Sequence, residues 1–192
     1  MAERAELGDA HETLLAVTIP EKPGSFKRFL GALGRRAITE FNYRFSAPGA
    51  AHLFVGIKLG DDPAERAAIV RLLRDDGYPV RDLSGNEMAK EHVRYMVGGR
   101  CPDLPDEVLY SFEFPERPGA CLNFLNAIHG RWNISLFHYR NHGAADGRVL
   151  CGLQVPKAER RELTRTLDAL GYYYVEETGN PAYELFLGTN GA

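Results

Sequence analysis

The sequence is poor in the features that mark secreted, membrane-spanning or nucleic-acid-binding proteins. Its three cysteines, Cys101, Cys121 and Cys151, are an odd number without Cys-x-x-Cys spacing, so we expect reduced thiols and a cytoplasmic location. No apolar run approaches the ~20 residues that cross a bilayer. The net charge of −3 and the isoelectric point of about 6.1 argue against a nucleic-acid or anionic membrane surface, which is usually basic. We therefore expect neither nucleic acid nor a membrane as a partner.

Recognisable catalytic and metal-binding arrangements are also missing. His138 and His142 are four residues apart, but on a strand that spacing separates them by ~13 Å, whereas metal ligands lie ~2 Å from their ion. The sequence shows no Ser-His-Asp or Cys-His arrangement of the kind used in nucleophilic catalysis. The run Ser25-Phe26-Lys27 looks like the lysine site of a pyridoxal phosphate enzyme, but it falls inside an expected helix and no Gly-rich phosphate loop accompanies it. We expect no catalytic residue, no metal and no cofactor in this chain.

What the sequence does have is an internal repeat. Pro-Glu-Lys-Pro-Gly-Ser at 20–25 returns as Pro-Glu-Arg-Pro-Gly-Ala at 115–120, about half the chain further on. Each copy follows a strand-like run and precedes a helix-like one. Proline suits the first turn of a helix, and glycine lets another group approach the backbone. The first amides of such a helix have no partner within it and can hold a carboxylate, which makes Gly24 and Gly119 candidate binding residues.

The first half reads as strand, helix, strand, strand, helix, strand and a small extension, which is the split βαβ pattern of the ferredoxin-like fold. Apolar residues at helical spacing predict the helices, and runs of strand-forming residues predict the strands. The expected elements are a strand at 13–19, a helix at 24–36, a strand at 38–45, a turn at 47–50, a strand at 53–59, a helix from 62 that ends at 76–77, a strand at 78–83, a helical turn at 87–91 and a strand at 92–97.

The second half repeats this plan. The motif Phe-x-Tyr-Arg at 41–44 recurs at 137–140, and Gly56 recurs as Gly152. Repetition of several landmarks in the same order predicts two copies of one fold. The expected elements are strands at 108–114, 134–140 and 149–155, helices at 120–129 and 159–170, and a last strand at 183–187.

These patterns predict an α+β protein with two tandem ferredoxin-like βαββαβ domains packed side by side. Residues 98–105 break every periodicity, so we place the domain boundary there. The expected division is an N-terminal linker or helix end at 1–12, a first domain at 13–98, a linker at 99–107 and a second domain at 108–192. Because the linker is short and each half has open sheet edges to cover, we expect one rigid unit.

Several phrases in the chain resemble the C-terminal regulatory region of biosynthetic threonine deaminase. They lie at 16–21, 40–44, 92–99 and 133–140, and the resemblance extends over nearly the whole chain. It implies two ACT-like domains side by side, and a site that senses isoleucine as feedback inhibitor with valine as antagonist. It also implies that the pyridoxal phosphate catalytic domain of that family precedes this region and is missing here, and that the protein forms a homo-oligomer.

An amino-acid effector needs a partner for its carboxylate, a partner for its ammonium group and an apolar pocket. Neighbouring Tyr and Arg residues on a strand point to opposite faces, Arg binds carboxylates through its planar fork, and Tyr and Phe supply a wall. Glu21 and Glu116 could meet the ammonium group, although surface solvation is the simpler role for them. The resemblance favours an effector site that includes Tyr43, Tyr139, Arg140 and Arg94, and the full expected set is Phe41, Tyr43, Arg44, Arg94, Phe137, Tyr139, Arg140, Gly24 and Gly119.

Other classes of protein fit the sequence less well. A free-standing ACT-type amino-acid-binding regulator of another enzyme is the main alternative. An RNA-recognition domain has the same element order, but the strands at 53–59 and 149–155 lack its basic and aromatic run. A small hydrolase of the acylphosphatase type would need a Gly-rich nest with an adjacent Arg, which the Pro-Gly loops lack.

Overall fold

The strands of this chain form one continuous eight-stranded sheet in the order β4-β1-β3-β2-β6-β7-β5-β8. The computed structural model describes residues 11–45, 48–86, 89–90, 93–95, 99–101, 104–115, 117–128, 130–140, 146–181, 183 and 187–188. All strand pairs in the sheet are antiparallel. The strands are β1 (Glu12–Pro20), β2 (Ile38–Arg44), β3 (Ala50–Lys58), β4 (Val80–Asp82), β5 (Glu107–Pro115), β6 (Asn133–Arg140), β7 (Asp146–Gln154) and β8 (Tyr173–Glu176).

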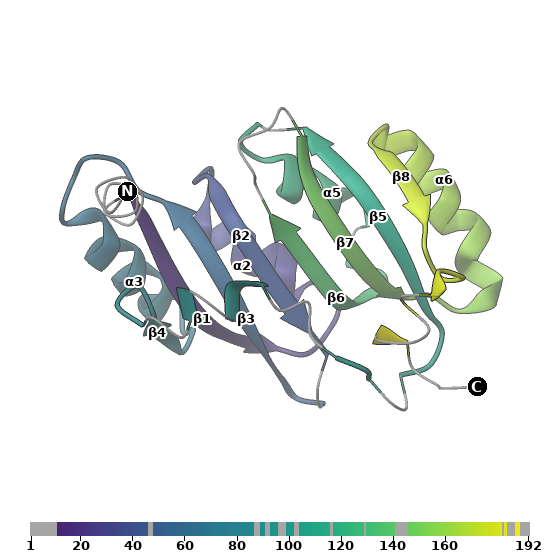
Figure 1. Ribbon diagram of the computed structural model, residues 1–192, viewed down its shortest axis with the longest axis horizontal. Coiled ribbons are helices and arrows are strands. Elements are labelled where there is room, and N and C mark those ends of the chain that lie inside the picture. Colours follow the sequence, from purple (N-terminus) through teal and green to yellow (C-terminus); the bar gives the residue numbers. More distant parts are fainter. Residues whose placement is uncertain are drawn as a thin grey trace.

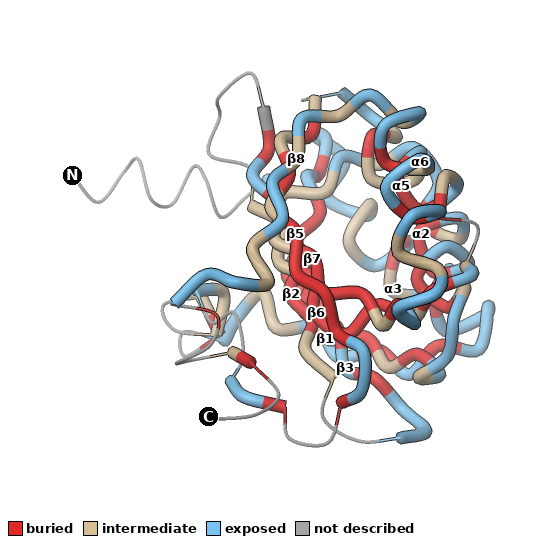
Figure 2. The backbone as a smooth tube through the Cα atoms, turned by 90° about the vertical axis from the view of Figure 1, so that its right-hand side faces the viewer, coloured by how far each residue is buried: buried red, intermediate tan, exposed pale blue. Residues whose placement is uncertain are grey.

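Four helices cover one face of the sheet (Figures 1 and 2). They are α2 (Ser25–Leu33), α3 (Glu65–Asp75), α5 (Ala120–Ala127) and α6 (Arg160–Leu170). Both α2 and α5 begin after a glycine in the left-handed conformation, Gly24 with φ 86° and Gly119 with φ 91°. Only glycine adopts that conformation without steric cost, so the repeated Pro-Gly pair fixes where each of these helices starts.

The expected fold class is confirmed: each half is a βαββαβ unit, and the chain carries two tandem ACT-like units. Each unit has the same internal strand order, β4-β1-β3-β2 in the first half and β8-β5-β7-β6 in the second. The halves meet where β2 pairs with β6, in a register that runs from Glu40 opposite Arg140 to Arg44 opposite Leu136. We call this β2–β6 junction the seam.

Most expected elements of the two units are present, with ends shifted by a few residues, but two predicted strands are wrong. Val93–Tyr95 form a short 3-10 helix, η1, in place of the strand at 92–97. Tyr183 and Leu187 belong to helical turns, and the fourth strand of the second half is β8. Tyr183 and Leu187 lie four apart, and both pack on the face of the sheet opposite the four helices. This spacing suits one side of a helix. The remaining residues of both predicted strands, and part of the turn at 47–50, lie outside the described residues.

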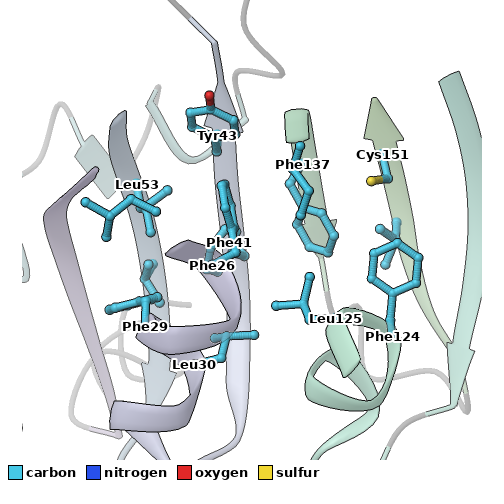
Figure 3. Packing of buried hydrophobic residues seen from close by; sticks show 14 of the residues in the cluster. Phe26, Phe29, Leu30, Phe41, Tyr43, Leu53, Phe124, Leu125, Phe137 and Cys151 are labelled. Atoms are coloured by element: carbon cyan, nitrogen blue, oxygen red, sulfur yellow. The ribbon is translucent and has the colours of Figure 1, made fainter. Parts of the chain in front are cut away.

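The main core lies between the sheet and the four helices and runs across the seam. Phe41 on β2 and Phe137 on β6 are almost fully buried, with ring centroids 5.4 Å apart in an edge-to-face contact. Phe26 on α2 contacts Phe41 from the first half, and Phe124 on α5 contacts Phe137 from the second (Figure 3). Because aromatic pairs of this kind dominate core energetics, neither half has a complete core of its own at the seam.

A buried ion pair on the other face also joins the halves. The guanidinium of Arg44 on β2 donates to the carboxylate of Glu107 on β5, and their side chains are 8% and 1% exposed. Tyr183 Oη donates to Glu107 Oε2 at 2.7 Å, and Ser135 Oγ donates to Glu107 Oε1. Arg44 Nη2 also donates to the backbone oxygen of Leu187 at 2.6 Å. The Glu107 carboxylate is therefore fully hydrogen-bonded, as a buried charge must be.

We expect Arg44→Met to lower the free energy of unfolding by about 3–5 kcal/mol, because it leaves Glu107 buried without its counter-charge. Urea unfolding followed by the fluorescence of Trp132, the single tryptophan, measures this. The matched control is Arg148→Met, which breaks the pair of Arg148 (69% exposed) with Glu113; an exposed pair contributes roughly 0–1 kcal/mol. Equal losses in the two variants, or separate transitions for the two halves in the parent chain, would contradict this account.

Candidate functional site

The structure divides the nine residues expected at the effector site between the two faces of the sheet. The alternation of Tyr and Arg along the strands holds, so each Tyr faces the helices and each Arg faces the other way. Phe41, Tyr43, Phe137, Tyr139 and the loop glycines Gly24 and Gly119 lie on the helix side, whereas Arg44, Arg94 and Arg140 lie on the opposite face.

Arg94 and Arg140, like Arg44, already have partners within the chain. Arg94 Nε donates to Glu40 Oε2 at 3.0 Å, and its Nη2 lies 3.4 Å from Glu12. Arg140 Nε lies 3.8 Å from Glu40 Oε1, and its guanidinium carbon is 4.3 Å from the centroid of the Tyr95 ring. Burial raises the pKa of the Glu40 carboxyl, and the hydrogen bond and charge of Arg94 oppose that rise. These two arginines hold the carboxylates of Glu12 and Glu40. Arg140 also lines a cavity of about 240 Å³ on this face, together with Glu113, His138 and Arg148.

The helices α2 and α5 lie side by side at the seam and run in opposite directions, so each Pro-Gly loop meets the end of the other half's helix. The first loop meets the C-terminal end of α5, where Lys22, Gly24 and Phe26 line the same small space as Leu125 and Ile128. The second loop meets the C-terminal end of α2. The repeat thus creates two equivalent positions between the halves.

The first of these positions is closed. Tyr43 Oη donates to Glu21, and Asn133 Nδ2 from the other half donates to Glu21 Oε1 at 3.0 Å. A methyl group added at Gly130 would lie 3.0 Å from Gly24 Cα, so the two backbones already touch. Burial is the main cause that raises the pKa of Tyr43 well above its ordinary value, and the Glu21 carboxylate raises it further. The Tyr43 hydroxyl therefore stays protonated and remains a hydrogen-bond donor. Only about 10 Å³ of space is left, which is about the minimum that a single water molecule needs.

The second position is an open cavity of about 240 Å³, which we call the seam cavity. It lies between the C-terminal end of α2, the start of β2 and the second Pro-Gly loop. Its walls include apolar residues from both halves and three cations. Among the lining residues are Leu30, Gly34, Arg36, Ala37, Ile38, Lys58, Arg117, Gly119, Cys121, Leu122 and Tyr139.

Two differences between the repeats keep the seam cavity open. Where the closed position has Trp132 and Asn133 at the start of β6, the seam cavity has Arg36 and Ala37 just before β2. Trp132 is 4% exposed and fills one side of the closed position. Arg36 is partly exposed and donates to the backbone oxygen of Leu33 at 2.7 Å. Ala37 has no side-chain donor, so it cannot make the hydrogen bond by which Asn133 ties the loops together.

The seam cavity brings together two opposite helix ends. The first turn of α5 leaves amide donors and a positive dipole end, and the last turn of α2 leaves carbonyl acceptors and a negative one. Arg117 and Lys58 add exposed positive charge beside the start of α5. Leu30, Ile38 and Leu122 supply apolar surface. A small zwitterion with an aliphatic side chain matches this set of groups.

Of the expected residues, Gly119 and Tyr139 line the seam cavity, and Gly24 lines the closed position. Phe41 and Phe137 lie in the core beneath and are almost fully buried. Leu30 and Ile38 did not appear among the expected residues, because only the packing of one half on the other brings them to the second Pro-Gly loop. Leu122 could have been found from the sequence, because it occupies an inward position at helical spacing in α5.

The part of the chain that the structure describes contains neither a candidate metal-ion site nor a candidate membrane-spanning helix. No group of three or more His, Cys, Asp or Glu residues there could hold a metal ion. None of the described helices is both long and apolar enough to cross a bilayer. Lys27, the lysine of the Ser-Phe-Lys run, is exposed on α2.

The fold and the site thus define a tandem pair of ACT-like units with a cavity of about 240 Å³ between them. A family model described as the C-terminal regulatory domain of threonine dehydratase matches residues 3–93 and 99–187. The chain therefore belongs to the family of threonine dehydratase C-terminal regulatory domains.

Individual relatives agree with this. The chain is 54% identical over 187 residues to the L-threonine dehydratase biosynthetic IlvA of Burkholderia multivorans, covering 97% of this chain and 37% of the relative. It is 54% identical to the Escherichia coli protein of the same name, with 97% and 36% covered. It is 41% identical over 195 residues to the mitochondrial threonine dehydratase of Saccharomyces cerevisiae, with 97% and 34% covered. The chain thus spans little more than a third of the length of these relatives.

The thiol of Cys121 reports on the seam cavity. Burial raises its pKa to about 12, so almost none of it is thiolate near neutral pH. Because the thiolate is the reactive form, we expect iodoacetamide at pH 8 to modify Cys121 ~10³-fold more slowly than a free cysteine. Peptide mass spectrometry follows Cys121 separately from the other cysteines, and the same chain in urea supplies the reference rate. A folded-state rate within tenfold of the urea rate would show that the thiol is not buried in this way.

Proposed function

We propose that this chain is the part of a biosynthetic threonine dehydratase that binds isoleucine as a feedback inhibitor, and that the seam cavity is the effector site. Valine acts as the antagonist by competing for the same cavity. The observation that carries the proposal is the asymmetry of the seam. Of two equivalent positions between the halves, side chains fill one and leave the other open to an amino acid.

The groups in the seam cavity suit each part of the ligand. The carboxylate would lie at the first turn of α5, where amides and the charge of Arg117 favour an anion. The ammonium group would lie toward the carbonyl end of α2, near Gly34. The branched side chain would pack against Leu30, Ile38 and Leu122, with the ring of Tyr139 as a wall.

A ligand in the seam cavity contacts both halves at once, which gives it a means of control. It would bind more tightly to one relative placement of α2 and α5 than to another, and such a difference is an allosteric coupling energy, typically ~1–3 kcal/mol. The parent enzyme in this proposal is a pyridoxal phosphate-dependent threonine ammonia-lyase of isoleucine biosynthesis, cytoplasmic and homo-oligomeric. The catalytic domain of that enzyme precedes this region and responds to the altered placement of α2 and α5. Within the chain we propose domains at 13–98 and 108–192.

Isothermal titration calorimetry tests the ligand. Isoleucine should bind the chain, valine should bind several-fold more weakly because one buried methylene contributes ~0.8 kcal/mol, and alanine should barely bind. Tyr139→Ala should weaken isoleucine binding through the loss of its wall. The matched control is Tyr43→Phe, at the equivalent position of the closed contact, which should leave isoleucine binding unchanged.

Substitution of the arginines on the opposite face of the sheet is the test that can contradict this assignment. If Arg140→Ala weakens isoleucine binding more than tenfold while Tyr139→Ala does not, the effector binds on the face of the sheet opposite the four helices and the seam-cavity assignment fails. If neither substitution matters although isoleucine binds, both assignments fail.

We also expect no release of ammonia or 2-oxobutanoate from threonine when the chain is supplied with pyridoxal phosphate. Lys27 is exposed on α2, and a lysine that holds this cofactor needs a phosphate-binding loop beside it. A coupled assay for 2-oxobutanoate measures the activity. Turnover above the blank that Lys27→Ala abolishes would contradict the expectation.

A further inference from the structure

The cavity that Arg140 lines, on the face of the sheet opposite the four helices, has no part in the function proposed above. Its volume is about 240 Å³, and its lining comes from strands β5, β6, β7 and β8 of the second half. We call it the arginine cavity. Its lining includes the polar residues Ser111, Glu113, His138, Arg140, Arg148 and Tyr173, together with the apolar residue Leu150.

Two arginines lie directly opposite each other in this cavity. Arg140 on β6 pairs in register with Arg148 on β7, so both side chains leave the same face of the sheet. The Cβ atoms of such a pair are about 5 Å apart, and like charges in that arrangement destabilise a sheet. The Arg140 side chain is 28% exposed and the Arg148 side chain 69%. Two cations held this close together favour an anion between them.

The carboxylates that accompany the two arginines lie on their outer sides. Arg148 Nη1 donates to Glu113, which is opposite Arg148 on β5. Glu40 is opposite Arg140 on β2, and its Oε1 lies 3.8 Å from Arg140 Nε, too far for a hydrogen bond. Across the four strands the charges therefore run negative, positive, positive, negative. Among the described residues, none supplies a negative charge between the two arginines.

The guanidinium of Arg140 still has donors to offer. A guanidinium has five N–H donors, and that of Arg140 donates no hydrogen bond to any residue that the structure describes. Its guanidinium carbon lies 4.3 Å from the centroid of the Tyr95 ring, which attracts its charge. Arg148 uses Nη1 for Glu113 and keeps its other N–H groups. An oxyanion in the cavity can thus accept hydrogen bonds from both arginines.

The first half has a cavity in the equivalent place, but its side chains neutralise each other. His52 occupies the position of Arg148, four residues before the repeated glycine of the strand, and Thr18 is opposite His52 as Glu113 is opposite Arg148. Thr18 Oγ1 and His52 Nδ1 lie 3.0 Å apart in a hydrogen bond. This pair leaves no fixed charge where the second half has an arginine.

The counterpart of Arg140 in the first half is Arg44, and it is neutralised as well. The Arg44 side chain is 8% exposed and pairs with the buried carboxylate of Glu107. Arg140, by contrast, has only the more distant carboxylate of Glu40. The repeat therefore neutralises these positions in one half and concentrates positive charge at them in the other.

We propose that the arginine cavity binds a phosphate group, either as free phosphate or as the phosphate of a small monoester. The phosphate oxygens accept hydrogen bonds from Arg140 and Arg148. A phosphate group with close to two negative charges neutralises both arginines, whereas one carboxylate neutralises only one of them. In a monoester, the rest of the ligand lies along Leu150 and the ring of Tyr173, which is 65% exposed. The site shares no lining residue with the seam cavity and does not depend on isoleucine binding there.

Amide chemical-shift titration of the whole chain with inorganic phosphate and with phenyl phosphate, at constant ionic strength, tests the proposal. Both probes should give saturable shifts at the amides of Arg140 and Arg148. Acetate, with one charge, should bind there at least tenfold more weakly. Tighter binding of phenyl phosphate supports a monoester as the ligand, and equal or weaker binding supports free phosphate. Saturating isoleucine should displace neither probe.

Arg148→Met should weaken phosphate binding, followed at the Arg140 amide, roughly tenfold or more, because it removes one of the two charged donors. The variant should stay folded, because the Arg148 side chain is 69% exposed. Glu113→Gln should tighten binding, because it releases Arg148 from its carboxylate. The matched control is Arg81→Met, an exposed arginine at the equivalent cavity of the first half, which should leave the affinity unchanged.

Four results would overturn the proposal. They are the absence of saturable shifts at Arg140 and Arg148 with both probes, acetate binding as tight as phosphate binding, equal phosphate affinities in the parent chain and Arg148→Met, and displacement of phosphate by isoleucine. The last of these would assign the cavity to the carboxylate of an amino acid instead.

Discussion

The pairing of β2 with β6 is the contact on which the rest of the molecule depends. It turns two four-stranded sheets into one, and it sets α2 and α5 side by side in opposite directions. Each Pro-Gly loop then faces the end of the other half's helix. Without that pairing the loops would be ordinary strand-to-helix turns at a solvent-exposed edge. The cavity between the halves is therefore a property of the seam rather than of either unit.

The two equivalent positions at the seam differ, and this difference between the repeats leaves room for a ligand at one of them. Trp132, Asn133 and Glu21 close one position through packing and hydrogen bonds, whereas Arg36 and Ala37 stand in place of Trp132 and Asn133 at the other. A closed position holds the halves in register, and an open one leaves room for a ligand that can alter the register. A chain with two closed positions would be rigid, and one with two open positions would have less to hold its halves together.

The fold could be predicted from the sequence, but the site could be predicted only in part. The repeated motifs identify both units because each motif acts locally, through a helix start or a strand face. The helical turns at Tyr183 and Leu187 were missed because their spacing matters only against the face of the sheet opposite the four helices. Among the expected site residues, Gly119 and Tyr139 line the seam cavity. Arg44, by contrast, pairs with Glu107, a partner 63 positions away that no local pattern indicates.

The location of isoleucine in the bound complex tests this account most directly. With unlabelled protein and carbon-13-labelled isoleucine, isotope-filtered NOE spectra report which side chains lie within about 5 Å of the ligand methyl groups. We predict contacts to the ring protons of Tyr139 and the methyl groups of Leu30 and Leu122, which come from both halves. Ligand contacts confined to Tyr95 and other residues on the face of the sheet opposite the four helices would contradict the account.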